Sequence, residues 1–182
     1  MRVVLDTCVL FPTVMREMLL GAARLGHFTP LWSARILEEW ARAAVKLGPT
    51  GEMQARAEIA LLRAGWPKAE LSPAPAIEAR IWLPDVADIH VLAVAVSGSA
   101  DAIMTLNKKD FPRNILAEQD IARVEPDGFL HKVRQEDQAG MDQLGTRVLA
   151  EANRLSGDKW QIRPLLKKAR LPRLAKALGT TP

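Results

Sequence analysis

Short apolar runs alternate with segments of helical periodicity along most of this 182-residue chain, and this alternation restricts its fold more than any other feature. Three runs predict strands: residues 2–5 ("RVVL"), 28–32 ("FTPLW") and 101–106 ("DAIMTL"). Between the first two, "TVMREMLLGAARLG" from Thr13 has apolar residues at helical spacing and ends in glycine. Strands that alternate with helices form parallel sheets with right-handed crossovers. The sequence therefore predicts an α/β fold in which helices cover a central parallel sheet.

The remaining elements divide the chain into two parts. Three further segments predict helices: "ARILEEWARAAVKLG" after the N-cap candidate Ser33, "EMQARAEIALLRAG" from Glu52, and "DVADIHVLAVAVSG" at 85–98. After a proline-rich connector, "AIEARIWL" (76–83) alternates in the manner of a strand. Beyond Gly128 the pattern is wholly helical. We therefore predict a sheet-containing domain over residues 1–128 and a helical extension over residues 129–182.

Composition excludes several classes of protein. No apolar stretch approaches the roughly 20 residues of a membrane span, and Asp6 interrupts any signal-peptide pattern, so a cytoplasmic protein is expected. The single cysteine, Cys8, excludes an intramolecular disulfide framework. The three histidines are far apart, without ligand spacing. Any bound metal is therefore expected to be held mainly by oxygen.

Positive charge is concentrated at the C-terminal end. The chain has a formal net charge of +4, but seven cations and no acid lie between Lys159 and the end, so residues 1–158 hold 18 basic against 21 acidic residues. Two interpretations stay open. The end of the chain faces a polyanion, or it is an amphipathic helix whose cations only keep it soluble.

Acidic residues follow the predicted strands. Asp6 comes directly after the first strand, Glu38 and Glu39 follow the second, and the remaining acids lie near the third: Asp85, Asp88 and Asp110, with Asn107 between them in "TLNKKDFP". Functional groups of parallel sheets collect at the carboxyl ends of the strands. Carboxylates brought together there repel one another unless a divalent cation binds, and such oxygen ligands suit Mg²⁺ or Mn²⁺.

Each acid also has a purely structural explanation. Asp85 and Asp88 have the spacing of a capping box, and the two glutamates are ordinary first-turn acids of a helix. Asp110 before Phe111 is compatible with a turn. Asp6 is the exception, because a charged residue at the end of an apolar strand needs a partner. The set as a whole therefore favours a metal site.

Four motifs together resemble the PIN domain family, the metal-dependent ribonucleases found in VapC-type toxins of bacterial toxin–antitoxin pairs: "VVLDTCVL", "LWSARILEEW", "LPDVADIHVLAVAV" and "DAIMTLNKKDFP". The resemblance covers about residues 1–125. It implies a three-layer helix–sheet–helix domain and Mg²⁺- or Mn²⁺-dependent cleavage of RNA. It also implies four catalytic and metal-binding acids, namely Asp6, Glu39, Asp88 and Asp110.

Individual roles also come from this resemblance. Asp6 and Asp88 are expected to bind metal directly, whereas Glu39 and Asp110 bind through water or orient the nucleophile. Glu39 is preferred to Glu38 because the glutamate of the family usually precedes a bulky apolar residue, here Trp40. Supporting roles fall to the neighbours of these acids: Asn107, Thr105, Asp85 and Glu38. Where many members carry another aspartate this chain has Asn107, which leaves one or two metals open.

The resemblance also indicates binding partners, and two alternative functions are weighed against it. RNA is the expected substrate, a cognate antitoxin protein the expected partner, and a homodimer is left open. Candidate RNA-binding cations lie in the basic end: Lys167, Lys168, Arg170 and Arg173. One rival is a haloacid dehalogenase phosphatase, but Cys8 stands where its second aspartate belongs. The other is an inactive PIN fold that binds RNA or an antitoxin. His90 is expected at the surface, and the five tryptophans in the core or at interfaces.

Overall fold

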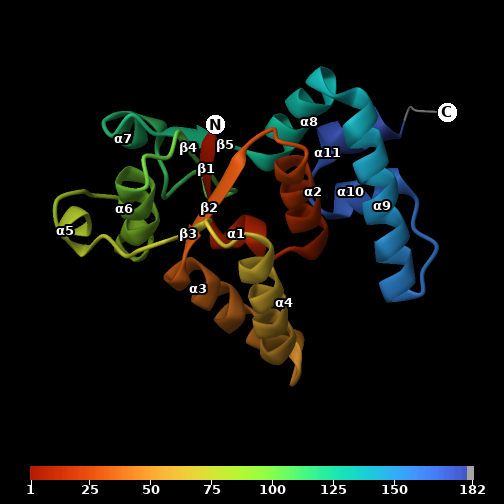
Figure 1. The fold of residues 1–182 in the computed structure, drawn as a ribbon, viewed down its shortest axis with the longest axis horizontal. Coiled ribbons are helices and arrows are strands. Elements are labelled where there is room, and N and C mark those ends of the chain that lie inside the picture. Colours follow the sequence, from red (N-terminus) through yellow and green to blue (C-terminus); the bar gives the residue numbers. More distant parts are fainter. Residues whose placement is uncertain (180–182) are drawn as a thin grey trace. The chain divides into compact units, whose positions relative to one another are not determined.

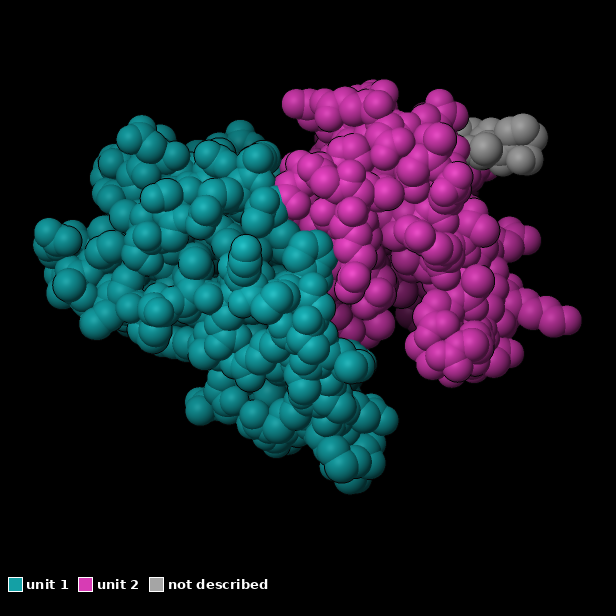
Figure 2. All heavy atoms as spheres, in the orientation of Figure 1, with its two compact units in different colours: residues 1–11, 29–124 teal, residues 12–28, 125–182 magenta. Residues whose placement is uncertain are grey.

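The computed structural model describes residues 1–179, which form two compact units (Figure 2). The sheet unit comprises residues 1–11 and 29–124, and the helical unit comprises residues 12–28 together with the chain from Glu125 onward. Within residues 1–179, no helix is both long enough and apolar enough to cross a membrane.

The sheet unit contains five parallel strands in the order β3-β2-β1-β4-β5 (Figure 1). Their bounds are β1 (Arg2–Leu5), β2 (Thr29–Ser33), β3 (Glu70–Leu71), β4 (Ala102–Met104) and β5 (Ala122–Val124). The central strand β1 buries Val3, Val4 and Leu5 completely. A strand with both faces buried reads as a continuous apolar run, which is why the sequence shows it clearly. The predicted α/β fold with a central parallel sheet is confirmed.

Six α-helices of the sheet unit accompany the five strands. Their bounds are α1 (Thr7–Leu10), α3 (Ala34–Ala44), α4 (Gly51–Gly65), α5 (Pro75–Glu78), α6 (Ile89–Ser97) and α7 (Arg113–Ala117), with single 3₁₀ turns at Val45–Leu47 and Val86–Asp88. α6 is apolar along its length and packs on β1, β2 and β4. α3 begins as predicted, because the Ser33 hydroxyl accepts a hydrogen bond from the Ile36 N–H at 3.3 Å. α3 then packs against α4.

One strand prediction was wrong. Residues 76–83 form no strand: α5 ends at Glu78, and an irregular segment continues to Asp85. Pro75 at the start of α5 fixes a helical φ angle, which outweighs the short alternation that follows. Conversely, the two edge strands β3 and β5 were missed. They have two and three residues, too few for a periodic pattern, and pairing with β2 and β4 defines them.

The helical unit consists of α2 (Thr13–Arg24), α8 (Pro126–Glu136), α9 (Gln138–Ser156), α10 (Ile162–Lys168) and α11 (Pro172–Leu178). α2 packs against α8 and α9, and Gly21 lies so close to Leu144 that a Cβ atom there would collide with the leucine. The rings of Phe28 and Phe129 meet edge to face at 5.3 Å. An N-terminal helix thus shares a core with the C-terminal helices. The domain boundary at residue 128 stays a prediction. The contacts between Cα atoms place residues 12–28 in the same unit as the chain from Glu125 onward.

Candidate metal centre

Asp6 lies directly after β1 and is 7% exposed. Its backbone N–H donates to the Met104 carbonyl at 3.1 Å, which continues the pairing of β1 with β4 by one residue. Its Oδ2 atom accepts hydrogen bonds from the Thr105 hydroxyl at 2.6 Å and from the Cys8 thiol at 3.0 Å. The strand register therefore fixes the backbone at Asp6, and two neighbouring donors orient its carboxylate.

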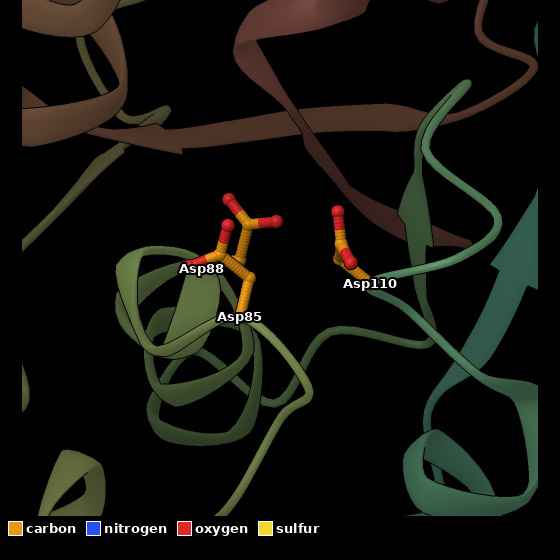
Figure 3. Close-up of side chains that lie close together, drawn as sticks. All are labelled: Asp85, Asp88 and Asp110. Carbon is orange, nitrogen blue, oxygen red and sulfur yellow. The ribbon is translucent and has the colours of Figure 1, made fainter.

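Three further carboxylates lie together at the end of the sheet (Figure 3). Asp85 and Asp88 come from the 3₁₀ turn before α6, and Asp110 comes from the loop after β4. One oxygen of each lies within 4.8 Å of one oxygen of the others. The Asp85 side chain also accepts from the Ala87 N–H at 2.9 Å, so its capping role is real. Asp85 therefore caps the 3₁₀ turn and is also one of the three clustered acids.

Asn107 joins two of these acids. Its Nδ2 atom donates to Asp88 Oδ2 at 3.2 Å and to Asp110 Oδ2 at 2.8 Å. Its Oδ1 atom accepts from the Asp110 N–H at 3.3 Å, and its own N–H donates to the Thr105 hydroxyl at 2.9 Å. The amide therefore holds the Asp88 and Asp110 carboxylates in place, and Thr105 connects this group to Asp6.

Negative charge accumulates at Asp88. Partial burial, followed by the neighbouring charges of Asp6, Asp85, Asp110 and Glu39, raises the pKa of this carboxyl to about 6. Five carboxylates are therefore close enough to influence one another. An all-oxygen donor set with this much mutual repulsion fits a hard divalent cation such as Mg²⁺ or Mn²⁺, which would remove the repulsion.

Glu39 lies on the side of α3 that meets α1 and α6. Its carboxylate accepts a hydrogen bond from the Thr7 hydroxyl at 3.0 Å, and its Oε1 atom lies 2.9 Å from His90 Nε2 and 3.5 Å from Arg35 Nε. Burial raises the pKa of Glu39, but His90, Thr7 and Arg35 outweigh it, so the net shift is downward. His90 Nε2 is buried and lies close to the Glu39 carboxylate without making a regular hydrogen bond to it. Glu39 is therefore ionised at neutral pH.

Glu38 points away from this group. It accepts from Arg42 Nε at 3.0 Å and from Arg56 Nη1 at 3.0 Å, so it ties α3 to α4. Hydrogen bonds from Arg56 and then from Arg42 lower the pKa of Glu38 to about 2. Of the two adjacent glutamates only Glu39 faces the acids, since neighbours on a helix point about 100° apart.

One expectation about another side chain was wrong. His90 is not at the surface: it is 2% exposed, and it contacts Glu39. The signal was available, because a helix that is apolar on all sides is buried, and its one histidine is buried with it. Trp32 and Trp40 are buried in the core as expected, whereas Trp82 is 61% exposed, so for Trp82 only the expectation of an interface stays open.

Cys8 agrees with a packing role. The thiol is half-buried and donates to Asp6 at 3.0 Å. Burial, followed by the Asp6 charge, raises the pKa of Cys8 to about 12. The thiolate form is therefore negligible at neutral pH, and this cysteine is a poor nucleophile.

The candidate RNA-binding cations belong to the helical unit and not to the carboxylate group. All four are exposed on or beside α10 and α11: Lys167, Lys168, Arg170 and Arg173. Lys168 Nζ lies 4.8 Å from the ring centre of Trp160, a cation–π distance. The leucines between these cations are buried, so the segment contributes both a core face and a basic face.

Comparison with known proteins gives one match. A family model described as the PIN domain matches residues 2–109, which is more than half of the chain. No curated protein and no solved structure matches. The matched range includes Asp6, Glu39, Asp88 and Asn107, and ends one residue before Asp110. This match decides against the phosphatase alternative. With a parallel sheet and converging acids at the carboxyl ends of its strands, the chain belongs to the PIN domain family.

Proposed function

We propose that this protein is a Mg²⁺- or Mn²⁺-dependent endoribonuclease, and that it acts as the toxin of a type II toxin–antitoxin pair. The observation that carries this proposal is the meeting of Asp85, Asp88 and Asp110 at one end of the parallel sheet of a PIN domain, near enough to Asp6 and Glu39 for the charges of these two acids to act on Asp88. Burial, followed by the charges of these acids, raises the pKa of Asp88, an arrangement typical of a site that holds a cation.

Each residue of the site has a separate task in this proposal. Asp6, Asp88 and Asp110 would hold the cation, with Asp85 at its exposed side. A divalent ion held by these carboxylates would supply a coordinated water of lowered pKa and positive charge for the phosphoryl oxygens. Asn107 keeps two of the carboxylates in position through its two Nδ2 hydrogen bonds.

Glu39 and Thr105 complete the site. The ionised Glu39 orients the attacking water by accepting its hydrogen bond, and contacts with Thr7 and His90 fix the direction of this carboxylate. The Thr105 hydroxyl donates to Asp6 Oδ2 and so leaves Asp6 Oδ1 for other ligands. These two positions determine orientation and need not touch the phosphate.

Cleavage of single-stranded oligoribonucleotides tests the proposal. The purified chain should cut them in the presence of Mn²⁺ or Mg²⁺ and not in EDTA. Asp6→Asn and Asp88→Asn should each reduce the rate at least a hundredfold, because each removes a charged oxygen ligand, while circular dichroism stays unchanged. Asp158→Asn is the matched control, since Asp158 is an exposed aspartate between α9 and α10.

Two results would contradict the enzymatic part of the proposal. Calorimetry that detects no Mn²⁺ binding to the wild-type chain would remove the metal site. Equal cleavage by the wild-type chain and by Asp88→Asn would assign the activity to a contaminant.

The toxin role needs a test in cells. Expression of the wild-type chain should arrest growth, expression of Asp88→Asn should not, and the product of a neighbouring small open reading frame should relieve the arrest. Growth arrest by both forms would contradict a toxin that acts through RNA cleavage.

The alternative function is a PIN module that binds RNA or an antitoxin without cleaving. Its support is Asn107, which places a neutral amide between Asp88 and Asp110 and leaves the site one charge poorer than a site with aspartate there. This alternative predicts RNA binding that is independent of divalent metal, with no cleavage product.

A further inference from the structure

Trp82 is an exposed aromatic residue three positions before Asp85 of the acidic cluster. It is 61% exposed, whereas its neighbour Leu83 is completely buried and anchors the segment to the core. Only two residues separate Trp82 from Asp85, so their Cα atoms lie within about 11 Å of each other. The residues between Trp82 and Asp88 other than Leu83 are exposed as well. The indole is therefore held at the surface, next to the turn that carries Asp85 and Asp88.

Two exposed cations belong to the other segments that carry site acids. Lys109 is exposed and lies in the loop between Asn107 and Asp110. Arg35, with a 53% exposed side chain, donates from Nη2 to the Ala87 carbonyl at 3.3 Å and lies 3.5 Å from Glu39. Arg35 thus connects α3 to the turn before α6 and keeps its cation at the edge of the acids. Two of the segments that carry site acids thus also carry an exposed cation.

Single exposed apolar residues are common and need no function. Leu61 on α4 is such a case: it is 74% exposed and has no candidate site residue nearby in the chain. Trp82 differs because three features coincide at one place: an anchored, exposed indole, exposed cations, and a group of metal-type ligands. A flat aromatic surface with cations for the backbone is the arrangement that binds single-stranded nucleic acid.

We propose that the Trp82 indole stacks on an unpaired base of the RNA substrate next to the scissile phosphate, with Lys109 and Arg35 contacting flanking phosphates. This inference rests on the proposed ribonuclease function and adds a specificity element to it. A base within a duplex is already stacked on its neighbours, so the contact selects single-stranded or looped RNA. Trp82 positions the substrate and takes no part in the chemistry.

Binding is measured in an Asp88→Asn background, so that the RNA stays intact. Fluorescence anisotropy with a labelled single-stranded oligoribonucleotide should give a Kd about tenfold higher for Trp82→Ala, the size expected from the loss of one base–aromatic stack. Trp82→Phe keeps an aromatic face and should restore most of the affinity. Leu61→Ala, the matched exposed control, should change Kd less than twofold.

An abasic scan identifies the stacked base. Replacing one nucleotide at a time by an abasic unit should weaken binding of the Trp82-containing chain strongly at one position near the cleavage site. The same abasic unit should have no further effect on Trp82→Ala, because both changes remove one interaction. A structural role for Trp82 would not produce this position-specific coupling.

The outcomes separate this inference from the function on which it rests. If the Asp88→Asn protein binds RNA, the wild-type chain cleaves it, and Trp82→Ala leaves the Kd unchanged, the role of Trp82 is overturned. The proposed nuclease function is then unaffected. A uniform loss of affinity at all abasic positions also overturns it. RNA that the wild-type chain neither binds nor cleaves contradicts the proposed function, and this inference with it.

Discussion

Asp88 occupies the point where the charges of the metal centre converge. Its pKa is raised to about 6 by burial and by four neighbouring acids, whereas Asn107 donates to it and holds it. When ionised, the Asp88 carboxylate thus lowers the stability of the metal-free protein, and it is also a candidate ligand for a cation. Its titration links stability, metal affinity and pH.

The metal-free chain should be destabilised by Asp88 above its pKa. A carboxyl whose pKa is higher in the folded state stabilises the fold below its usual pKa near 4, and this contribution is lost as pH rises through about 6. In EDTA, Asp88→Asn should therefore gain stability relative to wild type at pH 7.5, on the order of 1 kcal/mol after allowance for its solvent-facing side. At pH 4 this advantage should be absent.

Urea denaturation at the two pH values measures this difference. Stabilisation of the wild-type chain by Mn²⁺ should also be larger at pH 7.5 than at pH 5, because the cation and the proton compete for the carboxylate. A stability difference between the two proteins that is the same at both pH values would contradict the assignment of the raised pKa to Asp88.

Adjacent glutamates should behave differently in cleavage assays. Glu39→Gln removes the ionised carboxylate that faces the acids and should reduce kcat at least tenfold with little change in fold. Glu38→Gln loosens the contact of α3 with α4 through Arg42 and Arg56, and should leave kcat within about twofold, since it does not face the site. Equal losses in both variants would show that α3 is not oriented as described.

At the scale of elements, α2 is the helix with the least obvious partners. It follows α1 directly in sequence, yet its core contacts are with α8 and α9. Gly21 allows this approach, because a Cβ atom at this position would meet the Leu144 side chain. A small residue at a helix contact thus sets how closely α2 and α9 pack.

Gly21→Ala should therefore destabilise the helical unit. Alanine favours an isolated helix, so any loss of stability must come from overpacking against Leu144, and about 1–3 kcal/mol is expected. Thermal or urea unfolding measures it, and the double variant Gly21→Ala with Leu144→Ala should recover part of the loss. A stabilised single variant would contradict the close contact of α2 with α9.

At the scale of the whole molecule, charge and burial divide the C-terminal segment into two faces. Five leucines of this segment are buried: Leu165, Leu166, Leu171, Leu174 and Leu178. Truncation after Asp158 would expose the core of the helical unit, so loss of RNA binding in such a protein would say nothing about the cations. Substitution of the exposed cations separates the two roles.

Replacing Lys167, Arg170 and Arg173 together by glutamine should weaken RNA binding without unfolding the chain, since all three side chains are exposed. If each contacts one phosphate, the slope of log affinity against log salt should fall by about 0.7 per contact on single-stranded RNA. Anisotropy titrations between low and moderate salt measure the slope. Lys132→Gln, an exposed cation on α8, is the control. An unchanged slope would show that these cations do not contact RNA, which leaves solubility as their role.

The sequence by itself determined the architecture of the sheet and the acids at its edge. Buried parallel strands need continuous apolar runs, and the chain that follows each run lies at the carboxyl edge, so Asp6 and the loop that carries Asp110 were predictable at the same edge of the sheet. The adjacent pair Glu38 and Glu39 was resolved only through the resemblance, because helical spacing separates two directions without saying which one faces the sheet.

Only the tertiary structure decided which surfaces meet. An apolar stripe shows that α2 buries one face but not against which partner, and α8 and α9 lie more than a hundred residues further along the chain. The edge strands β3 and β5 exist because neighbouring strands offer them hydrogen-bonding partners, which no local pattern encodes. Trp82 is exposed for the same reason: the packing of distant segments, and not the polarity of a side chain, sets its access to water.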